Sequence, residues 1–169
     1  TAWKLAIAVP TGVRSVGLFV SPEDDKLERF VTGVQLDMIQ LSGDESPGRI
    51  NEIKERFSMP VIKSIHISGE SDLDNLDGYE SAADWLLFDT KVKGMHGGTG
   101  ETFDWSILKN RGFKQPWMLS GGLDESNVQE ALNILKPDAV DISSGVESAP
   151  GEKDNEKIIN FINAVKTEG

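Results

Sequence analysis

A glycine-rich stretch at residues 93–110, KGMHGGTGETFDWSILKN, combines side chains that could do chemistry. It contains four glycines, one histidine and two acidic residues, one of which is Asp104. This composition is compatible with a nucleotide-binding loop, a metal site, a surface loop or the mobile loop of an enzyme. A P-loop is excluded because no Gly-Lys-Ser/Thr sequence follows the glycines. A metal site is not favoured, because no His/Glu spacing brings further ligands toward His66 or His96.

The elements that must position this stretch alternate along the chain. Six short apolar runs predict strands, at residues 15–20, 36–43, 60–67, 83–90, 116–122 and 139–145. The longer segments between them predict helices, two of which begin with a Ser-Pro pair, at Ser21 and at Ser46. The four tryptophans, Trp3, Trp85, Trp105 and Trp117, are interpreted first as packing residues. Strands alternating with helices predict an α/β fold with a parallel sheet.

Polar and glycine residues collect just after the predicted strands, where both a (β/α)8 barrel and an open doubly wound sheet place their active sites. The last third of the chain favours the barrel, because barrels bind phosphate on the loops after strands seven and eight. These two loops contain the candidate phosphate-binding residues Gly121, Gly122, Ser143, Ser144 and Gly145. The glycines allow the backbone to approach a ligand closely, and the serines add hydroxyl donors.

The composition narrows the class of protein. The 169 residues fit one domain, and the absence of cysteine excludes disulfides, a zinc–thiolate site and a cysteine nucleophile on this chain. A net charge of −11 argues against nucleic acid and anionic membranes as partners, whereas a nest of backbone amides can still hold a small anion. No apolar run of about 18 residues and no signal peptide are visible, so a cytoplasmic location is expected.

Taken together, the motifs VGLFV, MIQLSGDE, VIKSI, LLFDT, GGTGETFDW, SGGL and SSGVE closely resemble the phosphoribosylanthranilate isomerase family, the Amadori isomerases of tryptophan synthesis. The resemblance covers essentially the whole chain in the family's order. It implies a (β/α)8 TIM barrel of the ribulose-phosphate-binding type. The six predicted strands then correspond to strands three to eight, and the family's first two strands have no counterpart. Residues 1–169 are therefore expected to form a single barrel domain that is incomplete at its N-terminus.

The resemblance also implies a reaction. A general acid protonates the ring oxygen of N-(5′-phosphoribosyl)anthranilate, and a general base removes the C2′ proton, which gives the aminoketose without any metal or organic cofactor. Asp104 matches the family's general acid. We expect Phe103, Trp105 and a closed loop to bury Asp104 and raise its pKa. The alternative is that Asp104 caps the short helix that follows it.

Further roles follow from the same resemblance. Gly97, Gly98 and Gly100 match a mobile loop. Asp141 matches an aspartate that faces the substrate, with a buried structural carboxylate as the alternative. The role of Gln40 is either a contact with the substrate or a hydrogen bond in the core. Ser42 occupies the position where the family usually has histidine. Asp89 and His66 are interpreted as structural residues of the barrel.

The family's base, a cysteine, and its carboxylate-binding arginine belong to the unmatched first two strands, so this chain alone is expected not to complete the reaction. The expected partner is the phosphorylated sugar–anthranilate substrate, and the complete protein is expected to be a monomer or homodimer. Two other functions remain open. An indole-glycerol-phosphate synthase would need a set of catalytic lysines and glutamates, of which only Lys63 is visible. A non-catalytic phosphate-binding protein is the other possible function, if the first two strands are truly absent from the protein.

Overall fold

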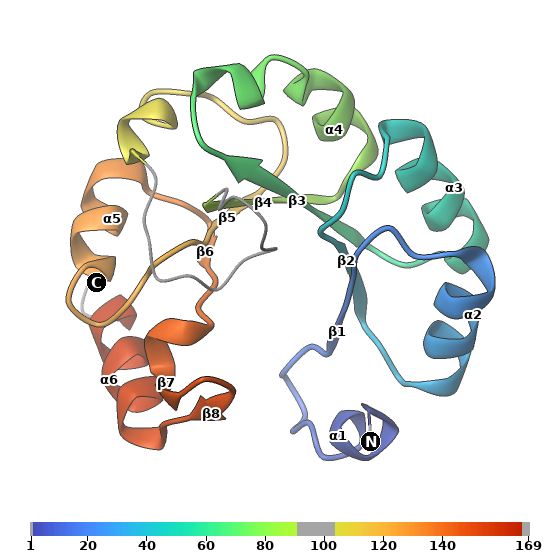
Figure 1. Ribbon diagram of the computed structural model, residues 1–169, viewed down its shortest axis with the longest axis horizontal. Helices are drawn as coiled ribbons and strands as arrows, with labels where there is room; N and C mark the ends of the chain where they lie inside the picture. The colour runs from blue at the N-terminus through green and yellow to red at the C-terminus, as the bar shows by residue number, and fades with distance from the viewer. Residues whose placement is uncertain (1, 91–103, 167–169) are drawn as a thin grey trace. The chain divides into compact units, whose positions relative to one another are not determined.

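The computed structural model describes residues 2–90 and 104–166 of the chain (Figure 1). Its main sheet has six strands in sequence order, β1 (Val16–Phe19), β2 (Met38–Leu41), β3 (Val61–Ile67), β4 (Trp85–Thr90), β5 (Trp117–Leu119) and β6 (Ala139–Val140). The six predicted strands are thus confirmed, with shorter ends. The chain divides into two compact units, Thr1–Ser64 with Asn75–Leu86 and Ile65–Asp74 with Leu87–Gly169, which are called unit 1 and unit 2.

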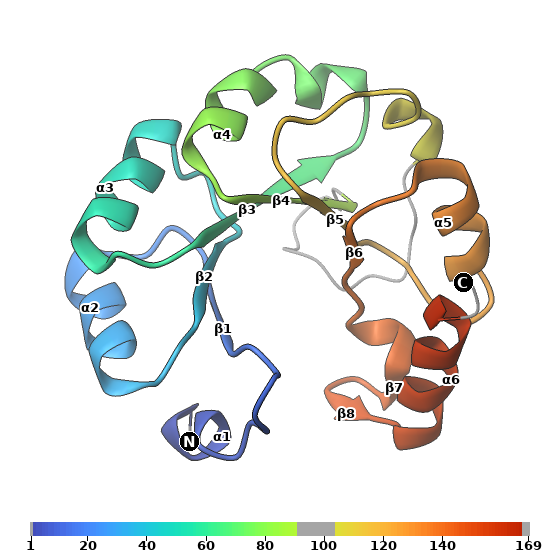
Figure 2. The ribbon, with the colours of Figure 1, turned by 180° about the vertical axis from the view of Figure 1, so that it is seen from behind.

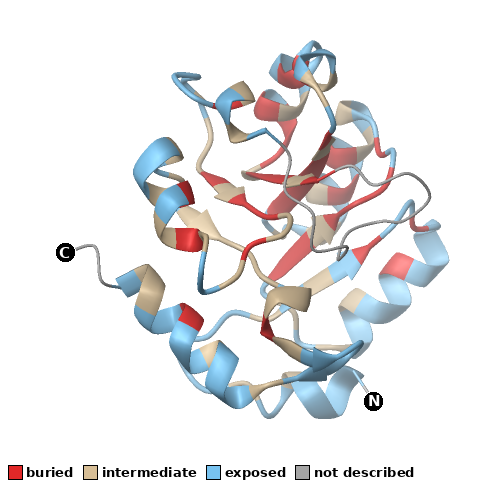
Figure 3. Ribbon diagram, turned by 60° about the vertical axis from the view of Figure 1, so that its left-hand side comes forward, coloured by how far each residue is buried: buried red, intermediate tan, exposed pale blue. Residues whose placement is uncertain are grey.

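Unit 1 is a parallel sheet covered by helices. β1 pairs with β2 and β2 pairs with β3, both in parallel, with Ile39 opposite Val61. The helices are α1 (Ala2–Ala6), α2 (Asp24–Gly33), α3 (Pro47–Phe57) and α4 (Leu76–Ala82). Leu27 of α2 and Ile50 and Ile53 of α3 are buried against the strand residues Ile39, Leu41 and Val61. Figure 3 shows the result, with buried residues on the strands and on the inner faces of the helices.

The two predicted Ser-Pro helix starts differ in outcome. Ser46 caps α3 as predicted, since its hydroxyl accepts a hydrogen bond from the amide of Arg49 at 3.2 Å. The prediction for Ser21 is wrong, because α2 begins at Asp24 and Ser21 has a φ of 41°. The amide of Ser21 donates instead to Oε1 of Glu45 at 2.7 Å. A side chain distant in sequence therefore determines the backbone of Ser21.

Unit 2 contains the ends of β3 and β4, the strands β5 and β6, and the helices α5 (Val128–Leu135) and α6 (Asn155–Lys166). β5 and β6 pair in parallel, with Met118 opposite Ala139. α5 and α6 lie side by side, as Figure 2 shows from behind. Phe88 of β4 and Trp117 of β5 form an aromatic cluster with Phe113, with ring centroids 4.9–5.6 Å apart.

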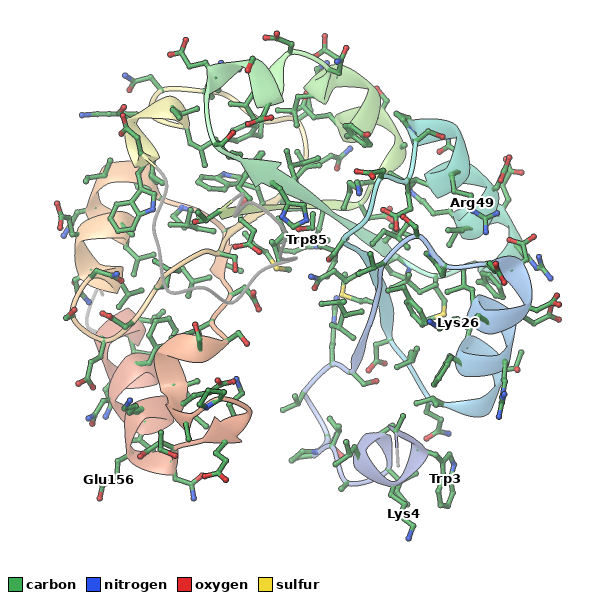
Figure 4. The ribbon with its side chains drawn as sticks, in the orientation of Figure 1. Trp3, Lys4, Lys26, Arg49, Trp85 and Glu156 are labelled. Atoms are coloured by element: carbon green, nitrogen blue, oxygen red, sulfur yellow. The ribbon has the colours of Figure 1, made fainter. Side chains whose placement is uncertain are left out.

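Three features were not predicted. β7 (Glu147–Ala149) and β8 (Glu152–Lys153) form a small antiparallel hairpin in a segment where no strand was predicted. The helix expected after Asp104 is a single 3-10 turn, η2 (Trp105–Ile107). Trp3 is 54% exposed and projects from α1, so its predicted packing role is wrong (Figure 4). None of the helices within residues 2–90 and 104–166 is long and apolar enough to cross a membrane.

Candidate functional site

The loops that follow β5 and β6 in unit 2 form a small pocket. All five residues predicted to bind phosphate line this pocket, and so does Asp141. The remaining lining residues are Asp89, Ser120, Leu123 and Ile142. The structure therefore brings together two segments that are about twenty residues apart in the sequence, as expected for the carboxyl ends of neighbouring parallel strands.

The backbone of the first loop is shaped to present amides. Gly121 has a φ of 90° and Gly122 a φ of 66°, a left-handed conformation that favours glycine. Among the described residues, no acceptor takes a hydrogen bond from the amides of Gly121, Gly122, Ser144 or Gly145. Successive amides without a described acceptor are a feature of nests, which can bind an anion.

Two glycines are required by close packing. A Cβ at Gly121 would lie 2.3 Å from Oγ1 and 2.6 Å from the amide nitrogen of Thr90. A Cβ at Gly145 would lie 2.1 Å from the carbonyl oxygen of Leu123. The first loop therefore packs directly on the end of β4, and the second loop packs on the first.

The hairpin β7–β8 supports the second loop. Nζ of Lys153 donates to the carbonyl oxygen of Ser143 at 2.8 Å and forms an ion pair with Glu147 at 2.7 Å. The hydrogen bond from Lys153 and the amide of Gly151 lower the pKa of Glu147. Sequence reasoning missed Lys153, although it follows the Ser-Ser-Gly turn at a short distance, because the hairpin that returns it to Ser143 was not predicted.

Asp141 is held at the pocket by β5. Its amide donates to the carbonyl oxygen of Leu119 at 2.8 Å, and its Oδ2 accepts a hydrogen bond from the hydroxyl of Ser120 at 2.9 Å. Ser120 is itself buried, and its amide donates to the carbonyl oxygen of Phe88. The carboxylate is consequently oriented by a buried hydroxyl at the rim of the predicted phosphate site.

Asp89 is a second carboxylate of this pocket, which sequence reasoning had treated as structural. Its Oδ1 accepts a hydrogen bond from the amide of Thr90 at 2.8 Å, and its Oδ2 lies 4.0 Å from Nδ1 of His66. Burial raises the pKa of Asp89; the Thr90 amide and His66 oppose the rise, whereas the charge of Asp141 adds to it. The local sequence carries no signal of this grouping, because Asp89, His66 and Asp141 come from three different parts of the chain.

The environment of Asp104 differs from the predicted one. It is exposed and caps η2, with Oδ1 accepting from the amide of Ser106 at 2.9 Å. Hydrogen bonds from the hydroxyl and the amide of Ser106 lower the pKa of Asp104. The expected burial and raised pKa are therefore wrong for this conformation, in which the capping geometry dominates. Gly97, Gly98 and Gly100, predicted as a mobile loop, lie outside the described residues.

Gln40 and Ser42 belong to unit 1. Nε2 of Gln40 donates to the hydroxyl of Ser42 at 3.2 Å, and Ser42 is 5% exposed. This contact is the core hydrogen bond that was one of the two interpretations of Gln40, and it leaves substrate contact untested. Within residues 2–90 and 104–166, no three His, Asp or Glu side chains are grouped so that they could hold a metal ion.

Comparison with known proteins identifies the family. The sequence model of the N-(5′-phosphoribosyl)anthranilate isomerase family matches residues 3–164. The chain belongs to this family. A phosphoribosylanthranilate isomerase of Paracoccus denitrificans is 47% identical over 165 residues, which are 96% of this chain and 77% of that protein.

Solved structures of phosphoribosylanthranilate isomerases share the fold. The crystal structure of the Thermotoga maritima enzyme is 38% identical, with a TM-score of 0.87 over 98% of this chain and 79% of that one. A structure of a phosphoribosylanthranilate isomerase in complex with reduced 1-(o-carboxyphenylamino)-1-deoxyribulose 5-phosphate is 36% identical, with a TM-score of 0.83 over 98% of this chain and 78% of that one. The α/β architecture of this isomerase family is therefore confirmed for the chain, which spans somewhat more than three quarters of the length of these relatives.

Proposed function

We propose that this chain acts in the Amadori rearrangement of N-(5′-phosphoribosyl)anthranilate to 1-(o-carboxyphenylamino)-1-deoxyribulose 5-phosphate, an aldose–ketose isomerisation of tryptophan synthesis. The observation that carries the proposal is the nest of amides at Gly121, Gly122, Ser144 and Gly145, in a chain of this isomerase family. Nests at strand ends suit a terminal phosphate group. The substrate phosphate binds there, with the hydroxyls of Ser143 and Ser144 as further donors.

Asp104 is proposed as the general acid. Its carboxyl proton moves to the ring oxygen of the ribose, the bond from that oxygen to C1′ breaks, and an iminium forms with the anthranilate nitrogen. A base then takes the C2′ proton, and the enolamine becomes the aminoketose. Because the cap on Ser106 favours ionised Asp104, the carboxyl must leave that cap and be shielded from water to carry its proton.

Asp141 and Gln40 are proposed as substrate contacts. The support for Asp141 is its carboxylate at the rim of the phosphate pocket, where the adjoining ribose hydroxyls would be within reach. The support for Gln40 is its side-chain amide, which has two N–H donors, of which one bonds to Ser42. The glycines at positions 97, 98 and 100 are proposed to let the segment before Asp104 close over the substrate.

The six strands are proposed to be strands three to eight of a (β/α)8 barrel domain. Two observations support this assignment, namely the parallel pairs of the sheet and the phosphate-type pocket after its last two strands. On this assignment the base is supplied by residues outside the 169 of this chain, which contains no cysteine.

The test measures isomerisation by the chain alone and by the chain mixed with a peptide covering the first two strands of the Paracoccus denitrificans relative. We expect turnover only in the mixture, and loss of that turnover in the Asp104→Asn variant. Turnover by the chain alone would contradict the strand assignment. Phosphate binding without turnover in either sample would instead favour a non-catalytic phosphate-binding protein.

A further inference from the structure

The pocket after β5 and β6 combines anion-binding amides with two carboxylates, which is an unusual electrostatic arrangement for a phosphate site. Asp89 and Asp141 both line it, and none of its described lining residues is lysine, arginine or histidine. A phosphate dianion placed there would face two negative charges at short range. Like charges in a partly buried site repel strongly unless one of them takes up a proton.

Asp89 lies against the turn at Gly121 that is proposed to bind the anion. The position of a Cβ at Gly121 is 3.0 Å from Oδ1 of Asp89, so the carboxylate abuts the backbone whose amide binds the anion. Its side chain is 13% exposed, and within residues 2–90 and 104–166 it accepts one hydrogen bond, from the amide of Thr90 to Oδ1. Asp141, in contrast, already accepts a hydrogen bond from the buried hydroxyl of Ser120.

We propose that Asp89 determines which anion this pocket accepts, because its ionised carboxylate takes a hydrogen bond from a hydroxyl on the phosphate. This inference rests on the proposed phosphate site. A phosphate group that carries one proton supplies such a hydroxyl. A fully ionised oxyanion such as sulfate has only acceptors and cannot donate to the carboxylate of Asp89. The proton lies between a phosphate oxygen and Asp89, so no other group has to be protonated.

The charged surroundings of Asp89 agree with this role. Among the described residues, the titratable groups that act on it are His66 from β3 and Asp141 from the end of β6. Asp141 and burial favour a proton at Asp89, and His66 opposes it. Because burial has the largest effect, the pKa of Asp89 is raised and a shared proton with the ligand is easier to hold.

The consequence for the substrate is proton uptake. A phosphate monoester loses its second proton with a pKa of about 6, so at neutral pH it is mostly the dianion without a hydroxyl. Binding to the pocket then takes one proton from solution. Affinity for a sugar phosphate should fall about tenfold for each unit of pH above that value, since each unit removes nine tenths of the protonated form.

The experiment compares two dianions of the same shape and charge by isothermal titration calorimetry at pH 8. Hydrogen phosphate carries a hydroxyl and sulfate does not. We expect the wild-type chain to bind phosphate at least about tenfold more tightly than sulfate. Asp89→Asn should bring the two affinities within about threefold, because its amide can donate to either anion. Glu125→Gln, which removes an exposed charge near the same loop, should leave the discrimination unchanged.

Three results would overturn the inference. Equal binding of both anions by the wild type would show that Asp89 does not select the anion, and it would not contradict the phosphate site. Loss of discrimination in His66→Asn but not in Asp89→Asn would assign the selection to His66. Absence of any phosphate binding would overturn the phosphate site as well. If Asp89→Asn does not fold, the affinity of the wild type for ribose 5-phosphate is measured from pH 7 to pH 9. An affinity that is constant over this range would contradict proton uptake.

Discussion

Lys63 and Glu45 form an ion pair inside unit 1, with Nζ 2.8 Å from Oε2 and side chains that are 3% and 2% exposed. Nζ of Lys63 also donates to the carbonyl oxygen of Gly43 at 2.5 Å. Oε1 of Glu45 accepts from the amide of Ser21, and Oε2 from that of Gly43. The pair therefore fixes the turn after β2 and joins it to the end of β1.

Replacing Lys63 by methionine should destabilise the fold strongly. The substitution leaves Glu45 buried without its cation, and breaking a buried pair in this way costs about 3–5 kcal/mol. Chemical denaturation measures the loss as a change in the free energy of unfolding. Lys109→Met on the exposed surface is the matched control and should change it by less than about 0.5 kcal/mol. A loss below about 1 kcal/mol for Lys63→Met would show that the pair contributes little.

The same pair predicts how stability depends on pH. Burial acts to raise the pKa of Glu45, but the hydrogen bond and charge of Lys63, with backbone amides, outweigh it and leave the pKa below 4.5. Glu45 thus contributes stability that is present above pH 4.5 and lost as the pH falls through its folded pKa. Lys63→Met removes the hydrogen bond and the charge that lower the pKa of Glu45 most, and leaves burial opposed only by backbone amides. The pKa of Glu45 should therefore rise, and acidification from pH 7 should stabilise this variant relative to the wild type. Unfolding free energies at several pH values test the sign, and parallel curves for the two proteins would contradict it.

Local sequence patterns predicted the strands of the main sheet, but they did not predict the contacts between elements. The apolar runs predicted all six strands, and Ser46 with Pro47 predicted the start of α3. Ser21 carried the same local signal and failed, because Glu45, twenty-four residues away, binds its amide. The hairpin β7–β8 was missed because strands of three and two residues show no periodicity.

In the candidate site, too, local motifs could be predicted from the sequence and contacts between distant residues could not. The serines and glycines of the phosphate pocket were visible because each loop carries its own motif. The environment of Asp104 could not be predicted from the sequence. The same residues are compatible with Asp104 capping the turn at the amide of Ser106 and with its burial under a closed loop. The grouping of Asp89 with His66 and Asp141 depends on three strand ends meeting, which no single stretch of sequence records.

Asp104→Asn should separate catalysis from folding. The side-chain oxygen of asparagine can still accept from the amide of Ser106, so we expect the cap and the melting temperature to be retained. The variant has no proton to give, and loss of a general acid lowers kcat by about 100-fold or more. Turnover is measured in the mixture of chain and complementing peptide, with the exposed Asp74→Asn as the control. Turnover near the wild-type level would exclude Asp104 as the acid.

The edge of β1 should make the chain associate with itself. β1 is the first strand of the sheet, and Val16 and Leu18 are 42% and 60% exposed beside an apolar groove between α1 and β1. Exposed apolar edge strands promote pairing between chains. Leu18→Lys should shift the chain toward monomer in sedimentation experiments, whereas Ile159→Lys, on an exposed position of α6, should not. Equal association of both variants would place the contact elsewhere.

Gly121→Ala should weaken phosphate binding more than it weakens the fold. A left-handed φ costs alanine about 1–2 kcal/mol, and its Cβ would press on Oγ1 and the amide of Thr90. The loop must move away from β4 to relieve the contact, which misaligns the amides at Gly121 and Gly122. We expect phosphate affinity to fall at least about tenfold, because two charge-assisted hydrogen bonds lose their geometry.

The matched control for Gly121→Ala is Gly112→Ala, where a Cβ would meet no atom within 4 Å. Its phosphate affinity should equal that of the wild type, and its melting temperature should change little. Titration calorimetry and thermal unfolding on both variants separate the two effects. If Gly121→Ala bound phosphate as the wild type does while remaining folded, the amides of this turn would not be the anion site, because their geometry could not survive the displacement that the new methyl group requires.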